Sequence, residues 1–88
     1  MIWVTQAKHI KDFELEISFN DGKTFRINLS ESLSGEIFKP LNSLDAFKKF
    51  KVNADLDTVV WENGADFAPE FLYELGAKQK QSQEKGVG

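Results

Sequence analysis

Cysteine is absent from this chain of 88 residues, and histidine occurs once, as His9. The lack of thiols excludes disulfide bonds, thiolate nucleophiles and Cys-ligated zinc or iron–sulfur sites, and it fits a reducing compartment. A single histidine excludes a multi-histidine metal site, and its place on a predicted turn between lysines indicates a solvated side chain. A Ser-His-Asp triad would require His9 to meet a serine of the segment 30–34. We therefore expect a protein with no metal, no cofactor and no enzymatic activity.

Long apolar runs and glycine-rich loops are also lacking. No stretch approaches the roughly 20 consecutive apolar residues that a membrane-spanning helix needs. The first residues show no basic region ahead of a long apolar run, so no signal peptide is recognised and a cytoplasmic protein without membrane contact is predicted. The 6 glycines are isolated, which excludes a Walker loop and a glycine-rich dinucleotide turn.

The formal net charge of -3 hides an uneven distribution of charged residues. Residues 1–77 hold eight Lys or Arg against thirteen Asp or Glu, a balance of −5, whereas residues 78–88 hold three Lys against one Glu, a balance of +2. An acidic body repels phosphate backbones, so binding of nucleic acid by the domain alone is disfavoured. The hydrophobic fraction of 41%, with 8 Phe and 2 Trp, is sufficient for one core in a chain of this length.

Alternating apolar and polar residues predict an antiparallel hairpin over residues 13–29. Apolar side chains occupy every second position of residues 13–19, and the alternation resumes over residues 25–29. Such a period of two is typical of strands with one face in the core. Between the two runs, Asp21-Gly22 is the residue pair that best accepts the positive φ of a tight turn.

Shorter patterns predict the elements on either side of this hairpin. A segment rich in strand formers at residues 2–5, followed by a polar turn at residues 8–12, adds a third strand and completes a meander. The elements expected after the hairpin are a single helical turn at 30–35, an extended segment at 37–41, a short helix at 44–50 capped by Ser43, a strand at 58–61 and a helix at 69–75.

The last predicted helix has signals at both of its ends. Asn63-Gly64 reverses the chain ahead of it, and Phe67 and Leu72 are spaced as a hydrophobic staple. Gly76 is a natural stop, and the polar residues after it predict a disordered tail over residues 77–88. The fold class is therefore α+β, with one domain over residues 1–76 that combines an antiparallel meander with two or three short helices.

Acidic residues near the Asn-Gly turn are the first candidates for chemistry. Glu62, Asp66 and Glu70 could place two carboxylates close together, as acid–base catalysis or the binding of a hard cation requires. Their spacing differs from that of an EF-hand loop. The simpler interpretation is that Asp66 accepts hydrogen bonds from backbone amides of the turn, while the two glutamates are solvated.

Aromatic and basic residues give two further candidate surfaces. Trp3 and Trp61 are expected to face one another as core across the sheet; an exposed tryptophan beside Tyr73 would instead indicate a partner-binding surface. Lysines 48, 49 and 51 lie at the end of a predicted helix, where they complement the helix dipole or offer a docking spot for an acidic partner. The candidate interaction surface comprises Glu62, Asn63, Asp66, Tyr73, Lys48, Lys49 and Lys51.

One run of thirteen residues carries a family resemblance. Residues 61–73, Trp-Glu-Asn-Gly-Ala-Asp-Phe-Ala-Pro-Glu-Phe-Leu-Tyr, are preceded by Phe-Asn-Asp-Gly at 19–22, Phe-Lys-Pro-Leu at 38–41 and Phe47. Together they resemble the small bacterial domain-of-unknown-function 2442 family over roughly residues 2–75. Glu62 stands where the family pattern often has proline, and Asn28 where it often has aspartate.

The resemblance implies an α+β fold with an antiparallel sheet and short helices, and no enzyme activity is attached to the family. It also implies genes that often lie beside another small family, in an arrangement suggestive of toxin–antitoxin pairs. Some relatives carry an added helix-turn-helix domain, which has no counterpart in these 88 residues.

These observations favour a non-enzymatic protein-interaction or regulatory domain, antitoxin-like in its most specific form, with a partner encoded by an adjacent gene. An acidic body is suited to a basic partner, and an exposed sheet edge would bind by strand addition. The oligomeric state stays open. One alternative is a small-ligand-binding or catalytic module with a site around Asn63, Asp66 and Tyr73, and another is weak nucleic-acid binding through the patch at Lys48–Lys51.

Overall fold

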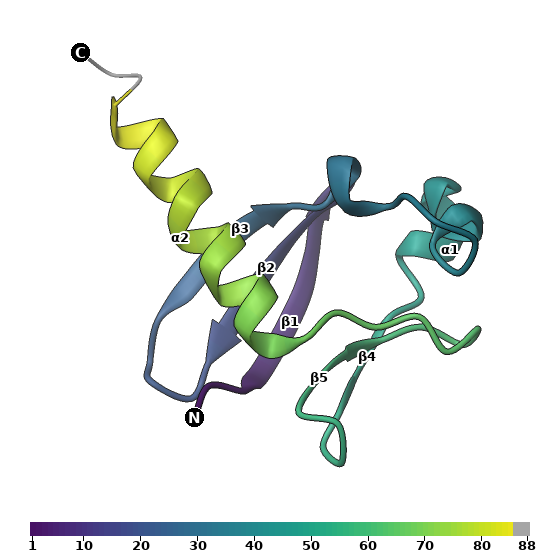
Figure 1. Cartoon of the computed structure of the whole chain (residues 1–88), viewed down its shortest axis with the longest axis horizontal. Helices are drawn as coiled ribbons and strands as arrows, with labels where there is room; N and C mark the ends of the chain where they lie inside the picture. Colours follow the sequence, from purple (N-terminus) through teal and green to yellow (C-terminus); the bar gives the residue numbers. More distant parts are fainter. Residues whose placement is uncertain (86–88) are drawn as a thin grey trace.

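The computed structural model describes residues 1–85 and has the expected α+β fold (Figure 1). Within these residues one antiparallel sheet has the order β1-β2-β3, and a second pairs β4 with β5. The strands are β1 (Val4–Lys11), β2 (Glu14–Phe19), β3 (Thr24–Asn28), β4 (Lys51–Asn53) and β5 (Thr58–Val60). The helices are α1 (Leu44–Phe47) and α2 (Pro69–Lys85), with 3₁₀ turns at η1 (Ser30–Ser32) and η2 (Lys39–Asn42).

The predicted hairpin is confirmed as β2 and β3. The strands pair antiparallel, with Glu14 opposite Asn28 and Ser18 opposite Thr24. Gly22 has a φ of 89° in the connecting turn, a left-handed conformation that glycine adopts without steric cost. The alternate side chains of the two strands are buried, as is that of Leu29 directly after β3; the others are Leu15, Ile17, Phe19, Phe25 and Ile27.

The core lies between the three-stranded sheet, α2 and the smaller sheet with its flanking turns. Figure 1 shows α2 crossing one face of the larger sheet, with its second half extending past the strands. Among the described helices, none is both long and apolar enough to cross a bilayer. The buried apolar residues contributed by the other elements are Val4, Leu33, Leu41, Phe47, Val59, Trp61, Ala65, Phe67 and Leu72.

The first strand is longer than the sequence indicates. β1 stays paired with β2 as far as Lys11 opposite Glu14, so the polar turn predicted for residues 8–12 is wrong. The reversal is confined to Asp12 and Phe13. β1 is an edge strand, and edge strands tolerate charged residues, which explains why polar composition concealed it.

His9 therefore lies on a strand rather than on a solvated turn. Its side chain is half-buried, and its ring lies 6.3 Å from that of Phe47 in an edge-on arrangement. Its Nε2 donates a hydrogen bond to the carbonyl oxygen of Asp12 at 2.8 Å. These contacts give the single histidine a structural role, because it ties the β1–β2 turn to the core.

The final helix begins at Pro69 as predicted, but it continues to Lys85 instead of ending at Leu75. Gly76 is buried within the helix, where an added Cβ would lie 2.7 Å from the Cβ of Phe25. This glycine permits a close approach of α2 to β3 and does not stop the helix. The predicted disorder of the tail is thus wrong for residues 77–85, and residues 86–88 lie outside the described residues.

Gln79 fastens the second half of α2 to the edge of the sheet. The backbone N–H of Asn28 donates to Oε1 of Gln79 at 2.8 Å, and Nε2 of Gln79 donates to the carbonyl oxygen of Asn28 at 2.9 Å. The side-chain amide thus pairs with an edge residue much as a neighbouring strand would. This contact holds the helix against the sheet three residues beyond Gly76.

Two further local predictions are wrong. The segment 37–41 is not extended, because η2 forms with Pro40 in its first turn, where the missing N–H is not needed. No strand is predicted at β4, because its three residues are too few for a recognisable pattern. Trp3 and Trp61 do not face one another: Trp3 is 39% exposed, whereas Trp61 is 4% exposed among phenylalanines.

Candidate functional site

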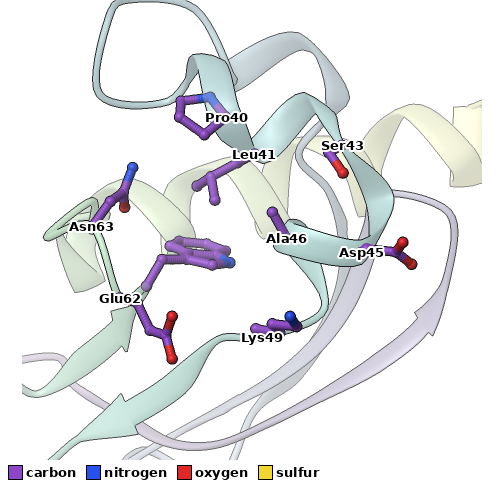
Figure 2. Close-up of a pocket in the computed structure, with 9 residues that line it drawn as sticks. Pro40, Leu41, Ser43, Asp45, Ala46, Lys49, Glu62 and Asn63 are labelled. Atoms are coloured by element: carbon purple, nitrogen blue, oxygen red, sulfur yellow. The ribbon is translucent and has the colours of Figure 1, made fainter.

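A pocket of about 330 Å³ opens between the η2–α1 segment and the turn that follows β5. Its apolar wall combines residues that are distant in sequence, since Pro40, Leu41 and Ala46 lie opposite Trp61. Figure 2 shows Glu62 and Lys49 at one end of the pocket and Pro40 at the other. The polar lining residues are Ser43, Asp45, Lys49, Glu62 and Asn63.

Trp61 gives the pocket a rigid base. Its indole Nε1 donates to the carbonyl oxygen of Phe47 at 2.8 Å, so the one polar atom of the buried ring is satisfied. The ring centroids of Phe47, Phe50 and Phe67 lie 5.8, 6.4 and 5.8 Å from that of the indole. Because these neighbours fix the ring, the pocket is preformed on its apolar side.

Asn63 is held in place by the turn that it forms. Its Oδ1 accepts the N–H of Ala65 at 3.1 Å, and its Nδ2 donates to the carbonyl oxygen of Ile37 at 2.8 Å. Gly64 follows with a φ of 88°, and the N–H of Trp61 closes the turn on the carbonyl oxygen of Ala65 at 2.9 Å. The predicted reversal at Asn63-Gly64 is confirmed, and Asn63 links this turn to the segment before η2.

Charges of both signs line the rim. Asp45, Lys49 and Glu62 are all exposed, and in Figure 2 the carboxylate of Asp45 points outward from the pocket. Glu62 and Lys49 therefore present one negative and one positive group at the same end. A preformed apolar base with hydrated charges at its rim can accept an amphipathic side chain whose polar end stays near water.

Tyr73 does not join Asn63 and Asp66 in a common site. Its hydroxyl donates to Oδ2 of Asp21 at 2.7 Å, and its ring lies edge-on to those of Phe19 and Phe25, at 5.0 and 5.3 Å. That hydrogen bond, together with one from the N–H of Lys23, lowers the pKa of Asp21. Tyr73 thus pins the tip of the β2–β3 hairpin to α2.

Asp66 does not serve the turn in the way the sequence predicts. Its backbone forms a bridge with Val60, and its side chain is exposed. The N–H of Ala65 in the turn donates instead to Oδ1 of Asn63. In the described part of the chain, no hydrogen bond involves the carboxylate of Asp66. The predicted hydrogen bonding of Asp66 to turn amides is therefore wrong.

The three lysines are exposed, but they have different surroundings. Lys49 lines the pocket, whereas Lys48 and Lys51 do not; Lys51 belongs to β4, opposite Val60. Of the predicted interaction surface, the pocket thus brings together Glu62, Asn63 and Lys49. The sequence did not indicate that residues 40–46 form the opposite wall of the pocket. The Phe-Lys-Pro-Leu run at 38–41 and the helix start at Ser43 are the signals that lie there.

One of three comparisons with known proteins found a match. A search of curated proteins and a search of solved structures each found no match. A family model described as a protein of unknown function, DUF2442, matches residues 4–78. This match extends from the start of β1 into the second half of α2, and it includes every wall of the pocket. The chain belongs to the DUF2442 family.

Proposed function

We propose that this chain is a non-enzymatic interaction domain whose Trp61 pocket receives a side chain of a protein partner. The observation that carries the proposal is the pairing of a fixed apolar base with exposed charges of both signs. Apolar burial at the base supplies affinity, and rim charges select among partners and orient them. The acidic balance of residues 1–77 favours a partner with a basic surface, as expected of an antitoxin-like protein.

Binding is better supported than catalysis at this site. General acids and bases usually acquire useful pKa values through burial or through close charged partners. The charged groups on this rim are exposed, and none of the ion pairs found in residues 1–82 involves Asp45, Lys49 or Glu62. Strand addition at β3 has less support, because Gln79 already occupies the backbone groups of Asn28.

Adjacent lysines provide a matched experiment. Lys49→Glu changes the rim, whereas Lys48→Glu makes the same charge change one residue away, outside the pocket. The tagged wild-type chain and both variants would be expressed at native level and tested for co-purification with the products of the neighbouring genes. We expect a stoichiometric partner with the wild type and the Lys48→Glu variant. With Lys49→Glu we expect a loss of roughly tenfold or more in affinity, because the new carboxylate repels the acidic group of the partner that pairs with Lys49, even where the rest of the partner's surface is basic.

Two outcomes would contradict the proposal. One is the absence of any stoichiometric protein partner of the wild type. The other is an equal loss with Lys48→Glu, Lys49→Glu and Lys51→Glu together with salt-dependent binding of DNA or RNA, because a phosphate backbone responds to the whole basic patch. Unchanged folding of each variant, checked by circular dichroism, keeps these outcomes interpretable.

A further inference from the structure

The outer face of α2 carries an exposed aromatic side chain. Phe71 is 42% exposed, and its ring ends a stack of three. The centroids of Phe38 and Phe67 are 4.7 Å apart with an interplanar angle of 16°, and those of Phe67 and Phe71 are 5.5 Å apart with an angle of 14°. The stack holds Phe71 rigidly at the surface, where its outer ring face is available to another molecule.

Phe71 and Leu75 form a ridge between two hollows. One hollow, of about 360 Å³, is completed by Glu74 and Lys78. The other, of about 460 Å³, lies toward η1 and also borders Gln79. This surface thus has an apolar ridge with a hollow on each side. Such a surface can pack against a second copy of itself, as helices do when the ridges of one enter the grooves of the other.

The charges on this face are also self-complementary. Glu74 and Lys78 are exposed and stand one helical turn apart, and neither forms an ion pair within residues 1–82. If a second α2 lies antiparallel, with the two-fold axis at the level of Gly76, each Glu74 faces Lys78 of the other copy. A two-fold interface repeats every contact, so this arrangement gives two such pairs, one on each side of the axis, with Phe71 of each copy further out.

We propose that two copies of this chain associate through the outer faces of their α2 helices, antiparallel, with Leu75 beside the two-fold axis and Phe71 of each copy packed against the second half of the other α2. This association is separate from the Trp61 pocket, whose lining includes no residue of α2. Because the proposed contact uses none of the lining residues of the pocket, we expect the pocket of each copy to stay open and the dimer to be bivalent for a partner.

Sedimentation velocity of the full chain at rising concentration tests the association. We expect the mass to rise from 10.0 kDa toward twice that value. Phe71→Glu should hold the chain as a monomer at every concentration. Leu56→Glu is the matched control, because Leu56 is also an exposed apolar residue, at 54%, but belongs to the β4–β5 connection; it should associate like the wild type.

Charge exchange in trans tests the antiparallel geometry. Glu74→Lys and Lys78→Glu should each weaken association of the pure variant, because like charges then face one another. An equimolar mixture of the two variants should associate at least as well as the wild type, since both interchain pairs become attractive. That recovery cannot come from helix stability, because within each chain residues 74 and 78 still carry like charges.

Three outcomes would overturn the proposal. The first is that the wild type remains a monomer up to millimolar concentration; binding of a different protein to α2 would then count against the proposal as well. The second is that the wild type associates with no response to Phe71→Glu. The third is that the mixture of charge variants behaves as the two pure variants do. Loss of partner binding by Lys49→Glu is independent of all three, so failure here is distinguishable from failure of the pocket proposal.

Discussion

Replacing Gly76 by alanine tests the packing of α2 more directly than any other change. An ideal Cβ at this position lies 2.7, 2.8 and 2.9 Å from the Cβ, Cγ and Cδ2 of Phe25. Because the nearest of these atoms is bonded to the backbone of β3, rotation of the ring does not remove the overlap. The helix has to move away from the sheet, and that movement also strains the bonds between Gln79 and Asn28.

The expected loss of stability follows from two opposing effects. Overpacking of a core costs about 1–3 kcal/mol, and contact with a Cβ places this case near the upper end. Alanine favours a helix over glycine by about 1 kcal/mol, so the free energy of unfolding of Gly76→Ala should fall by about 2 kcal/mol. For a domain of this size the melting temperature would then fall by roughly 10 °C.

Urea and thermal unfolding followed by circular dichroism provide the measurement. Lys80→Gly is the companion variant, because it tests whether the helix continues: at an exposed helical position it should lower stability by up to about 1 kcal/mol, and in a disordered tail it would change nothing. If Gly76→Ala is as stable as the wild type, or more stable, α2 is not pressed against Phe25 and the reasoning fails.

Two further predictions concern contacts that attach α2 to the sheet. Gln79→Ala should lower stability by about 1 kcal/mol through loss of two hydrogen bonds and should speed hydrogen exchange at the amide of Asn28; Gln81→Ala is the exposed control, and equal exchange in both variants would contradict the contact. In Tyr73→Phe, NMR titration should show the pKa of Asp21 rising toward its ordinary value of 3.8. Since the folded pKa is lowered, the stabilisation is present above the unfolded pKa of about 3.9 and is lost as pH falls through the folded value. The variant should therefore lose less stability on acidification, and an unchanged pKa of Asp21 would refute this role of Tyr73.

The parts of the fold that sequence predicts well are those whose signals are local. Alternation over residues 13–29 and the Asp21-Gly22 turn fix the hairpin, because side-chain period and turn chemistry act within a few residues. The strand before Trp61, the reversal at Asn63-Gly64 and the helix start at Pro69 follow for the same reason. Each of these elements presents its pattern without reference to a distant partner.

The wrong predictions concern segments whose local sequence is compatible with two structures, so that a contact with a residue distant in sequence decides between them. Gly76 is a helix stop by local rules, but Phe25 makes it a point of close approach. The polar half of β1 resembles a turn until pairing with β2 is known. Residues 77–85 have the composition of a disordered tail, but the side chain of Gln79 forms two hydrogen bonds with the backbone of Asn28. In all three cases the missing information is the identity of the neighbour.

The same distinction explains what the run at residues 61–73 contributes to function. Trp61 anchors the core, Asn63 builds the turn, and Tyr73 holds the hairpin, so most of its unusual residues have structural partners. Glu62 has no such partner among the described contacts and stands at the pocket rim opposite a wall from another segment. Where the fold leaves a side chain exposed beside a fixed apolar surface, that side chain is available for recognition. We therefore expect Trp61 to supply the apolar contact with a partner, and Glu62 of this run, together with Lys49 from the opposite segment, to select that partner.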